Sequence, residues 1–102
     1  MRREIGHLLI VDDDPVNRQL MTHHFERAGH TVSTADSGEQ ALDVIRGNDF
    51  DLILLDIMLP GMSGLDVLRN IRETHTLMEL PVIIVTGHDD SREVVDLSLI
   101  HI

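Results

Sequence analysis

The chain alternates between short apolar runs and longer segments in which apolar residues recur every three or four positions. The most apolar runs are residues 7–11, 51–55 and 81–86. Runs of this length without regular polar positions are typical of strands that are buried on both faces of a parallel sheet. Residues 30–35 form a further run that is richer in Thr, so we expect this strand nearer an edge of the sheet.

Helical periodicity separates these runs. Asp14 followed by Pro15 predicts a helix start, because Asp is a favoured N-cap and Pro suits the first helical position. This helix is expected to end at Gly29, and Ser37 and Ser63 predict two further helix starts. A fourth helix is expected from about Ser91. Apolar residues at helical spacing should face the sheet: Val16, Leu20, Met21 and Phe25 in the first helix, Ala41, Leu42, Val44 and Ile45 in the second, and Leu65, Leu68 and Ile71 in the third. The order β-α-β-α-β-α-β-α predicts an α/β fold with a parallel sheet and helices on both faces.

Composition narrows the class of protein. The 102 residues fit one domain, residues 1–102, and the net charge of −10 argues against direct binding to nucleic acid or to an anionic membrane. There is no cysteine, which excludes disulfides and thiolate chemistry. No apolar run approaches a membrane span, and the N-terminal stretch is too short for a signal peptide, so we expect a cytoplasmic protein. All eight basic residues are arginines.

Acidic residues gather where the predicted strands end. Asp12, Asp13 and Asp14 follow the first apolar run, Asp56 follows the third, and Thr86 ends the fourth. The carboxyl ends of parallel strands share one edge of a sheet, and carboxylates meeting there repel one another unless a divalent cation lies among them. Hard oxygen ligands suit Mg²⁺, and an Asp beside a metal can accept a phosphoryl group. The simpler interpretation is that Asp14 is a helix cap and that each remaining Asp is a turn residue.

Three segments carry a family resemblance. Residues 9–14 (Leu-Ile-Val-Asp-Asp-Asp), 54–64 (Leu-Leu-Asp-Ile-Met-Leu-Pro-Gly-Met-Ser-Gly) and 81–87 (Pro-Val-Ile-Ile-Val-Thr-Gly) resemble, in order and spacing, the receiver domains of two-component response regulators. Residues 38–42 are similar to the start of that family's second helix, and the resemblance extends over residues 7–96. It implies a flavodoxin-like doubly wound sheet with strand order 2-1-3-4, and a self-catalysed signalling module rather than a conventional enzyme.

The resemblance also implies residue roles. Asp56 would be the phosphoacceptor, and Thr86 would be the hydroxyl that moves to the phosphoryl group. The implied Mg²⁺ ligands are Asp12, Asp13, Asp56 and the backbone carbonyl of Met58. The side chains of Met58 and His88 would tune the lifetime of the phosphoryl group, although a solvated loop histidine is the simpler interpretation of His88. The donor would be a phosphohistidine on a histidine kinase or on a phosphotransfer protein, and the output domain is unknown.

The chain departs from the family towards its end. Family members continue into a fifth strand that ends in a lysine, and then into a fifth helix, whereas this sequence contains no lysine. We therefore expect a sheet whose fifth strand is missing, with residues 82–85 as an exposed hydrophobic edge. We also expect slow phosphorylation, because arginine replaces a compact ammonium group poorly. Residues 97–102 match one translated frame of a widely used transposon sequencing adapter, so we expect a non-native tail. Native codons at the genomic locus would contradict this.

Two other functions compete with this interpretation. Residues 12–16 also fit the D-x-D-x-[T/V] motif of haloacid-dehalogenase-type phosphatases, in which Asp12 would be the nucleophile. Those enzymes also use a lysine, and the segment from Asp56 to Gly64 would then have no explanation. The second alternative is a pseudo-receiver, a binding module that docks without being phosphorylated. Phosphorylation of Asp56→Asn and Asp12→Asn variants distinguishes the phosphatase from a receiver domain. A Mg²⁺ titration distinguishes the pseudo-receiver from a receiver domain that binds the metal.

Overall fold

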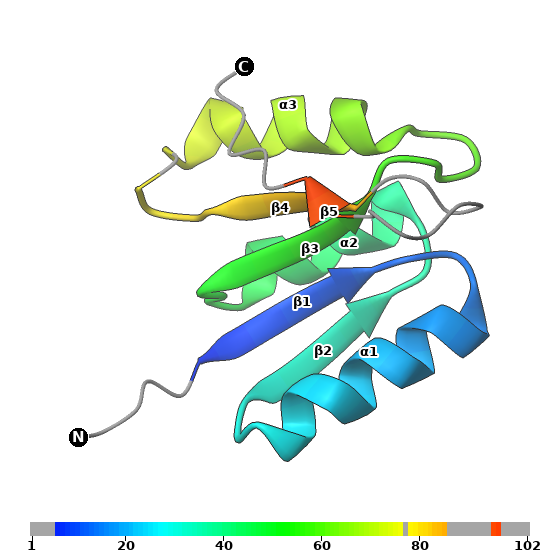
Figure 1. The fold of residues 1–102 in the computed structure, drawn as a ribbon. Helices are drawn as coiled ribbons and strands as arrows, with labels where there is room; N and C mark the ends of the chain where they lie inside the picture. Colours follow the sequence, from blue (N-terminus) through cyan, green and yellow to red (C-terminus); the bar gives the residue numbers. More distant parts are fainter. Residues whose placement is uncertain (1–5, 77, 86–94, 97–102) are drawn as a thin grey trace.

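The computed structural model describes residues 6–76, 78–85 and 95–96. The elements are β1 (His7–Val11), α1 (Pro15–Arg27), β2 (Thr31–Ala35), α2 (Gly38–Gly47), β3 (Leu52–Asp56), α3 (Gly64–Thr74), β4 (Val82–Val85) and β5 (Val95–Asp96). Strands β2, β1, β3 and β4 are parallel and adjacent in that order. The predicted order 2-1-3-4 is confirmed, and β2 lies at the edge of the sheet as expected (Figure 1).

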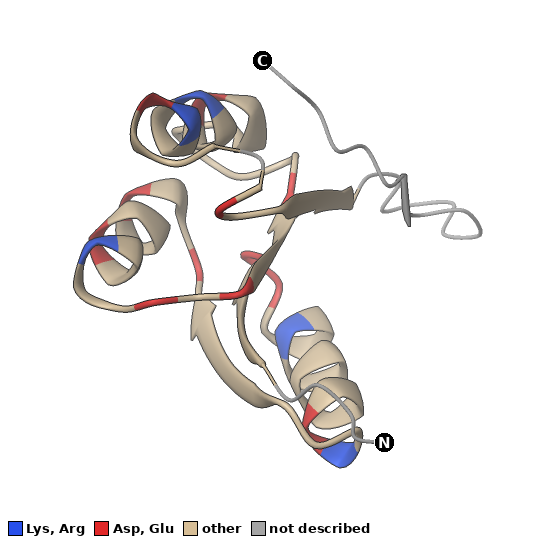
Figure 2. Cartoon of the chain, turned by 90° about the vertical axis from the view of Figure 1, so that its left-hand side faces the viewer, with Lys and Arg blue, Asp and Glu red and all other residues tan. Residues whose placement is uncertain are grey.

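The helices lie on both faces of the sheet. Viewed along the sheet, α2 and α3 cover one face and α1 lies on the other (Figure 2). The main core forms on the α2 and α3 side, where alternate residues of the strands meet the buried residues of the two helices. The strand residues are Leu9, Val11, Ile53, Leu55, Val82 and Ile84, and the helix residues include Ala41, Ile45, Val67, Leu68 and Ile71.

Short polar side chains start all three described helices, as predicted. Asp14 accepts a hydrogen bond from the backbone N–H of Val16 at 3.0 Å. Ser37 accepts one from the backbone N–H of Gln40, and Ser63 accepts one from that of Asp66. These bonds satisfy N–H groups that have no partner within the helix.

The apolar residues that recur at helical spacing in α1 are only partly covered. Val16 and Leu20 are 63% and 64% exposed, Met21 and Phe25 are only half-buried, and α1 buries none of its residues. The reason is the position of the helix, because α1 packs against β1 and β2 and no other described helix lies beside it on that face (Figure 2). The apolar residues of α1 therefore have the spacing of a helix, but neighbouring elements cover them only in part.

The end of the sheet also differs from expectation. Val95 and Asp96, predicted to lie in a helix, form the two-residue strand β5, which pairs antiparallel with Val85 and Ile84 of β4. Unpaired backbone groups on β4 offer hydrogen-bonding partners to a nearby extended segment, and the β-branched Val95 favours such pairing. The edge of β4 is therefore partly covered. The start of the predicted fourth helix and the tail at 97–102 lie outside the described residues.

Candidate functional site

The register of the sheet brings two of the predicted acidic residues together. Val11 of β1 lies beside Leu55 of β3. Asp12 and Asp56 are the next residues along these parallel strands, so both reach the same edge. The backbone N–H of Asp12 also donates to the carbonyl oxygen of Ala35 at 3.1 Å, which extends the ladder between β1 and β2 by one bond.

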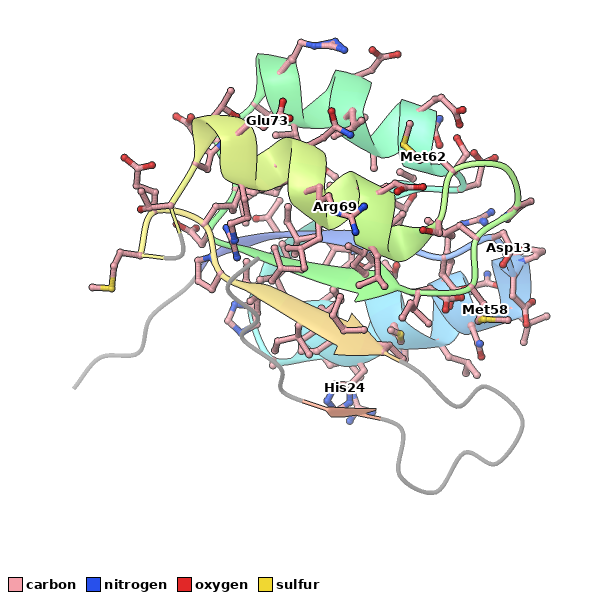
Figure 3. The ribbon with its side chains drawn as sticks, turned by 90° about the horizontal axis from the view of Figure 1, so that it is seen from above. Asp13, His24, Met58, Met62, Arg69 and Glu73 are labelled. Atoms are coloured by element: carbon pink, nitrogen blue, oxygen red, sulfur yellow. The ribbon has the colours of Figure 1, made fainter. Side chains whose placement is uncertain are left out.

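Asp12, Asp13 and Asp56 form one acidic cluster. Each contributes a carboxylate oxygen, and these three oxygens all lie within 4.8 Å of one another. Asp12 is buried, with 4% of its surface exposed, Asp56 is half-buried, and Asp13 is exposed. Figure 3 shows Asp13 and Met58 at the same end of the molecule. The structure thus brings together the three carboxylates that the sequence singled out, and it leaves the fourth, Asp14, as a helix cap.

Local hydrogen bonds orient the cluster. The backbone N–H of Asp14 donates to Oδ1 of Asp12 at 2.9 Å, and the backbone N–H of Met58 donates to Oδ1 of Asp56 at 2.9 Å. Both contacts join a side chain to the backbone two residues later, the geometry of an Asx turn. Each turn therefore fixes its carboxylate against the loop that leaves the strand.

The donor set fits a divalent cation. A buried carboxylate is costly unless a positive charge or hydrogen bonds compensate it, and three carboxylates this close repel one another. Within the described residues, the salt bridges are Asp43–Arg46 and Asp66–Arg69, and neither involves Asp12 or Asp13. Carboxylate oxygens are the ligands that Mg²⁺ and Ca²⁺ prefer. The cluster is therefore a candidate site for a hard divalent cation.

The loop after Asp56 depends on two glycines. Gly61 has a φ of +78°, a conformation that glycine adopts without strain. A Cβ atom on Gly64 would lie 2.5 Å from the carbonyl oxygen of Asp56 and 2.6 Å from Cα of Ile57. The start of α3 therefore packs directly against the backbone that carries Asp56. The prediction of a turn at residues 59–61 anticipated the first glycine, but nothing in the sequence alone indicated the close approach at the second.

Of the remaining predicted site residues, the structure describes Met58 but not Thr86 or His88. The side chain of Met58 is 59% exposed beside the cluster. Val85 pairs in register with Asp56, so the strand leading to Thr86 runs directly beside the predicted acceptor. Thr86 and His88 themselves lie outside the described residues, and their roles stay predictions. Sequence reasoning missed Arg18, whose guanidinium Nη1 donates to the backbone carbonyl of Asp12 at 2.9 Å.

Comparison with known proteins defines the class. The family model described as response regulator receiver domain matches residues 8–100. The chain is 43% identical over 88 residues to the transcriptional regulatory protein AfsQ1 of Streptomyces coelicolor. This alignment covers 86% of this chain and 38% of that protein. The chain is 40% identical over 86 residues to the uncharacterized transcriptional regulatory protein YkoG of Bacillus subtilis, covering 84% and 37%. The chain thus spans little more than a third of the length of these relatives.

Solved structures agree with this. The response regulator TrrA of Thermotoga maritima, solved in complex with Mg²⁺-BeF, matches with a TM-score of 0.76 and 34% identity over 87% of this chain and 76% of that chain. A CheY-like receiver domain protein of Methanospirillum hungatei matches with a TM-score of 0.73 and 30% identity, covering 90% and 70%. The fold is that of a CheY-like signalling domain with an acidic edge. The chain belongs to the response regulator receiver domain family of two-component systems, and accepting a phosphoryl group is the function of that family.

No helix in the described part of the chain combines the length and apolar character needed to cross a membrane.

Proposed function

We propose that Asp56 accepts the phosphoryl group and that Asp12, Asp13 and Asp56 hold Mg²⁺ beside it, together with the backbone carbonyl of Met58. The observation that carries this proposal is the convergence of three carboxylate oxygens within 4.8 Å at one edge of the sheet. The half-buried position of Asp56 at the end of β3 leaves it reachable from outside, whereas the carboxylate of Asp12 is buried. Asp56 is therefore better placed than Asp12 to meet a donor.

The chain itself supplies the nucleophile and its orientation. A carboxylate oxygen of Asp56 would attack phosphorus and form a P–O bond, while the P–N bond of the donor phosphohistidine breaks and its electron pair stays on the imidazole. The Met58 N–H holds Oδ1 of Asp56 during this step. A bound Mg²⁺ would neutralise charge on the carboxylates and on the incoming phosphoryl group. Such transfer depends mostly on positioning and charge stabilisation.

Three finer assignments belong to this proposal. Thr86 would donate its hydroxyl to a phosphoryl oxygen, since Val85 beside Asp56 leads directly to it. The side chains of Met58 and His88 would tune how long the acyl phosphate survives, and the exposure of Met58 next to the cluster supports its part. The donor would be a histidine kinase or a histidine phosphotransfer protein, and we infer that transfer takes place in the cytoplasm.

Intact-mass spectrometry after incubation with acetyl phosphate and Mg²⁺ tests the acceptor. The unmodified chain should gain the mass of one phosphoryl group, and it should do so slowly because no lysine is present in the sequence. Asp56→Asn should abolish this gain. Chelation of the Mg²⁺ should also abolish it, because the repulsion among the carboxylates is then uncompensated.

The same assay separates the alternatives. A gain that survives Asp56→Asn but is lost in Asp12→Asn would favour a phosphatase-like nucleophile at Asp12. No gain in any variant, together with no Mg²⁺-dependent change in the NMR signals of residues 12–14 and 56–58, would favour a pseudo-receiver. Family membership favours neither outcome, and both would contradict the proposal.

A further inference from the structure

Arg18 reaches back from the first turns of α1 to the acidic edge. Its Nη1 donates to the backbone carbonyl oxygen of Asp12 at 2.9 Å. That carbonyl belongs to the peptide unit that joins Asp12 to Asp13. The contact therefore acts on the backbone between two members of the cluster, six residues earlier in the chain.

Hydrogen bonds hold Asp12 from three directions. Its N–H is bound to the Ala35 carbonyl at 3.1 Å, its Oδ1 to the Asp14 N–H at 2.9 Å, and its carbonyl to Arg18. The first two bonds belong to the β-ladder and to the loop itself. The third comes from a side chain of α1, so it adds a direct link between the Asp12 backbone and that helix, beyond the cap that Asp14 provides.

Asp13 depends on this backbone more than its neighbours do. Its side chain is exposed and makes no hydrogen bond to another residue in the part of the chain that the structure describes. The backbone determines from where this side chain can reach the cluster, and Arg18 holds the peptide that precedes Asp13.

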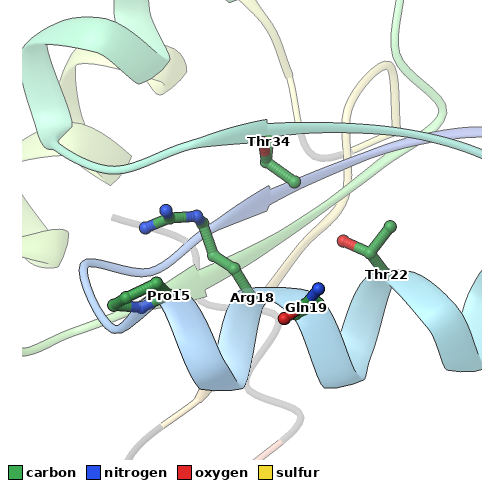
Figure 4. A pocket seen from close by; sticks show the side chains of 5 residues that line it. All are labelled: Pro15, Arg18, Gln19, Thr22 and Thr34. Atoms are coloured by element: carbon green, nitrogen blue, oxygen red, sulfur yellow. The ribbon is translucent and has the colours of Figure 1, made fainter.

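Packing does not force this contact. Arg18 is half-buried and lines a shallow, open pocket between α1 and β2, together with Pro15, Gln19, Thr22 and Thr34 (Figure 4). Figure 4 shows the Arg18 side chain leaving α1 towards the sheet. Because the pocket is open, the guanidinium has room to adopt other rotamers. In the described part of the chain, the side-chain hydrogen bond of Arg18 is the one to the Asp12 carbonyl.

We propose that Arg18 is a positioning residue for the cation site, which holds the Asp12–Asp13 peptide so that the two carboxylates converge with that of Asp56. This inference rests on the proposed function of the cluster as a Mg²⁺ site. Groups that orient metal ligands from outside the ligand set commonly change metal affinity by about 10–100-fold when they are removed.

The direction in which Mg²⁺ affinity changes when Arg18 is removed distinguishes a positioning role from a purely electrostatic one. Arg18 carries a positive charge close to the site, so charge alone predicts that its removal strengthens Mg²⁺ binding, since cations repel. Positioning predicts the opposite, because the carboxylates lose their fixed arrangement. The charge effect should also fade at high salt, whereas a positioning effect should persist.

The experiment compares Arg18→Gln, Arg18→Lys and the unmodified 102-residue chain. Mg²⁺ is titrated at low and high salt, and the dissociation constant is read from the backbone NMR signals of residues 12–14 and 56–58. We expect Arg18→Gln to bind Mg²⁺ about tenfold more weakly at both salt concentrations, the lower end of the range for such groups. Arg18→Lys, which keeps a donor and the charge, should recover part of the affinity.

A second readout needs no metal. The Asp14 amide donates to Oδ1 of Asp12. Its hydrogen exchange should accelerate in Arg18→Gln if the loop loosens, while amides in the middle of β3 should exchange unchanged. The matched control is Arg69→Gln on α3, which removes the same charge from an exposed pair with Asp66. This control should alter neither readout, and urea unfolding of both variants checks that each one is folded.

Several outcomes would overturn the inference. Equal or tighter Mg²⁺ binding by Arg18→Gln would leave only a charge effect, and unfolding of both Arg18 variants would make Arg18 a structural residue. If the unmodified chain shows no Mg²⁺-dependent change, the proposed function fails instead. The exchange rate of Asp14 then still reports whether Arg18 holds the loop.

Discussion

The two faces of the sheet have similar apolar patterns but differ in how completely they are covered. On the face of α2 and α3, strand and helix residues interlock in one buried cluster. On the face of α1, Leu8, Ile10 and Leu54 are buried, whereas Ile83 and Val85 are only half-buried. None of the residues of α1 itself is buried. An apolar pattern shows which residues can be buried. Whether they are buried depends on what else packs beside them.

The strongest test of this difference is a matched pair of leucine substitutions. Leu68 of α3 is 1% exposed and Leu20 of α1 is 64% exposed. Leu68→Ala should lower the free energy of unfolding by about 2–5 kcal/mol, because it leaves a cavity in the core. Leu20→Ala should change it by less than about 0.5 kcal/mol. Urea unfolding followed by circular dichroism measures both, and equal losses would mean that α1 is as well covered as α3.

A second pair of substitutions, at Arg72 and Arg69, tests how α3 is tied to the segment that leads into β4. Arg72 donates to the Leu80 carbonyl at 2.7 Å, and with longer bonds to those of Thr76 and His75, so it ties α3 to the segment that leads into β4. Burial lowers the pKa of Arg72 from its usual value. Arg72→Met should cost about 1–3 kcal/mol of unfolding free energy, because carbonyl groups lose their donor.

The control for Arg72 is Arg69→Met. Arg69 and Asp66 form an exposed pair three residues apart, and such pairs contribute less than about 1 kcal/mol. A loss for Arg69→Met as large as that for Arg72→Met would show that the hydrogen bonds to the loop contribute nothing specific.

Glycine substitutions test the contact between the covered face and the acceptor loop. Gly64→Ala places a Cβ within 2.5 Å of the Asp56 carbonyl oxygen, so overpacking should cost about 1–3 kcal/mol and displace the NMR signals of residues 56–58. Gly47→Ala at the end of α2 meets nothing within 4 Å and should be neutral or stabilising by up to about 1 kcal/mol. Unchanged signals in Gly64→Ala would contradict the close approach.

The smallest effect is expected at the start of the open helix. Asp14 caps α1 by accepting from Val16, and its loss in Asp14→Ala should cost about 1 kcal/mol. Mg²⁺ affinity should stay nearly unchanged, because Asp14 is a cap and not a member of the cluster. Calorimetry and a Mg²⁺ titration on the same sample check both. A large loss of affinity would place Asp14 among the cation ligands.

The strands, the helix starts and the meeting of Asp12 with Asp56 could be predicted from local patterns in the sequence. Apolar runs predicted the four parallel strands, and capping residues predicted the helix starts. Both features depend on residues that are close in the sequence. The pairing of Asp12 with Asp56 followed from strands of equal length ending at one edge. The exposure of the apolar residues of α1 could not be predicted, since it depends on which of the described elements pack on that face of the sheet. Nor could β5, because two residues carry too little pattern.

The long-range contacts of the site were also beyond sequence reasoning. Arg18 looks like an ordinary polar residue of a helix, and its bond to Asp12 depends on how α1 lies against the sheet. Gly64 looks like a residue at a helix start, and its importance depends on the backbone of Asp56 directly against it. Both contacts join elements whose relative placement no local pattern specifies.

Locating the phosphoryl group shows most directly whether Asp56 is the phosphoacceptor. The chain is phosphorylated with acetyl phosphate and Mg²⁺, the acyl phosphate is reduced with borohydride to a stable alcohol, and peptides are mapped by mass spectrometry. If Asp56 is the acceptor, only the peptide containing Asp56 carries the reduced residue. Modification at Asp12 or Asp13, with Asp56 intact, would contradict it.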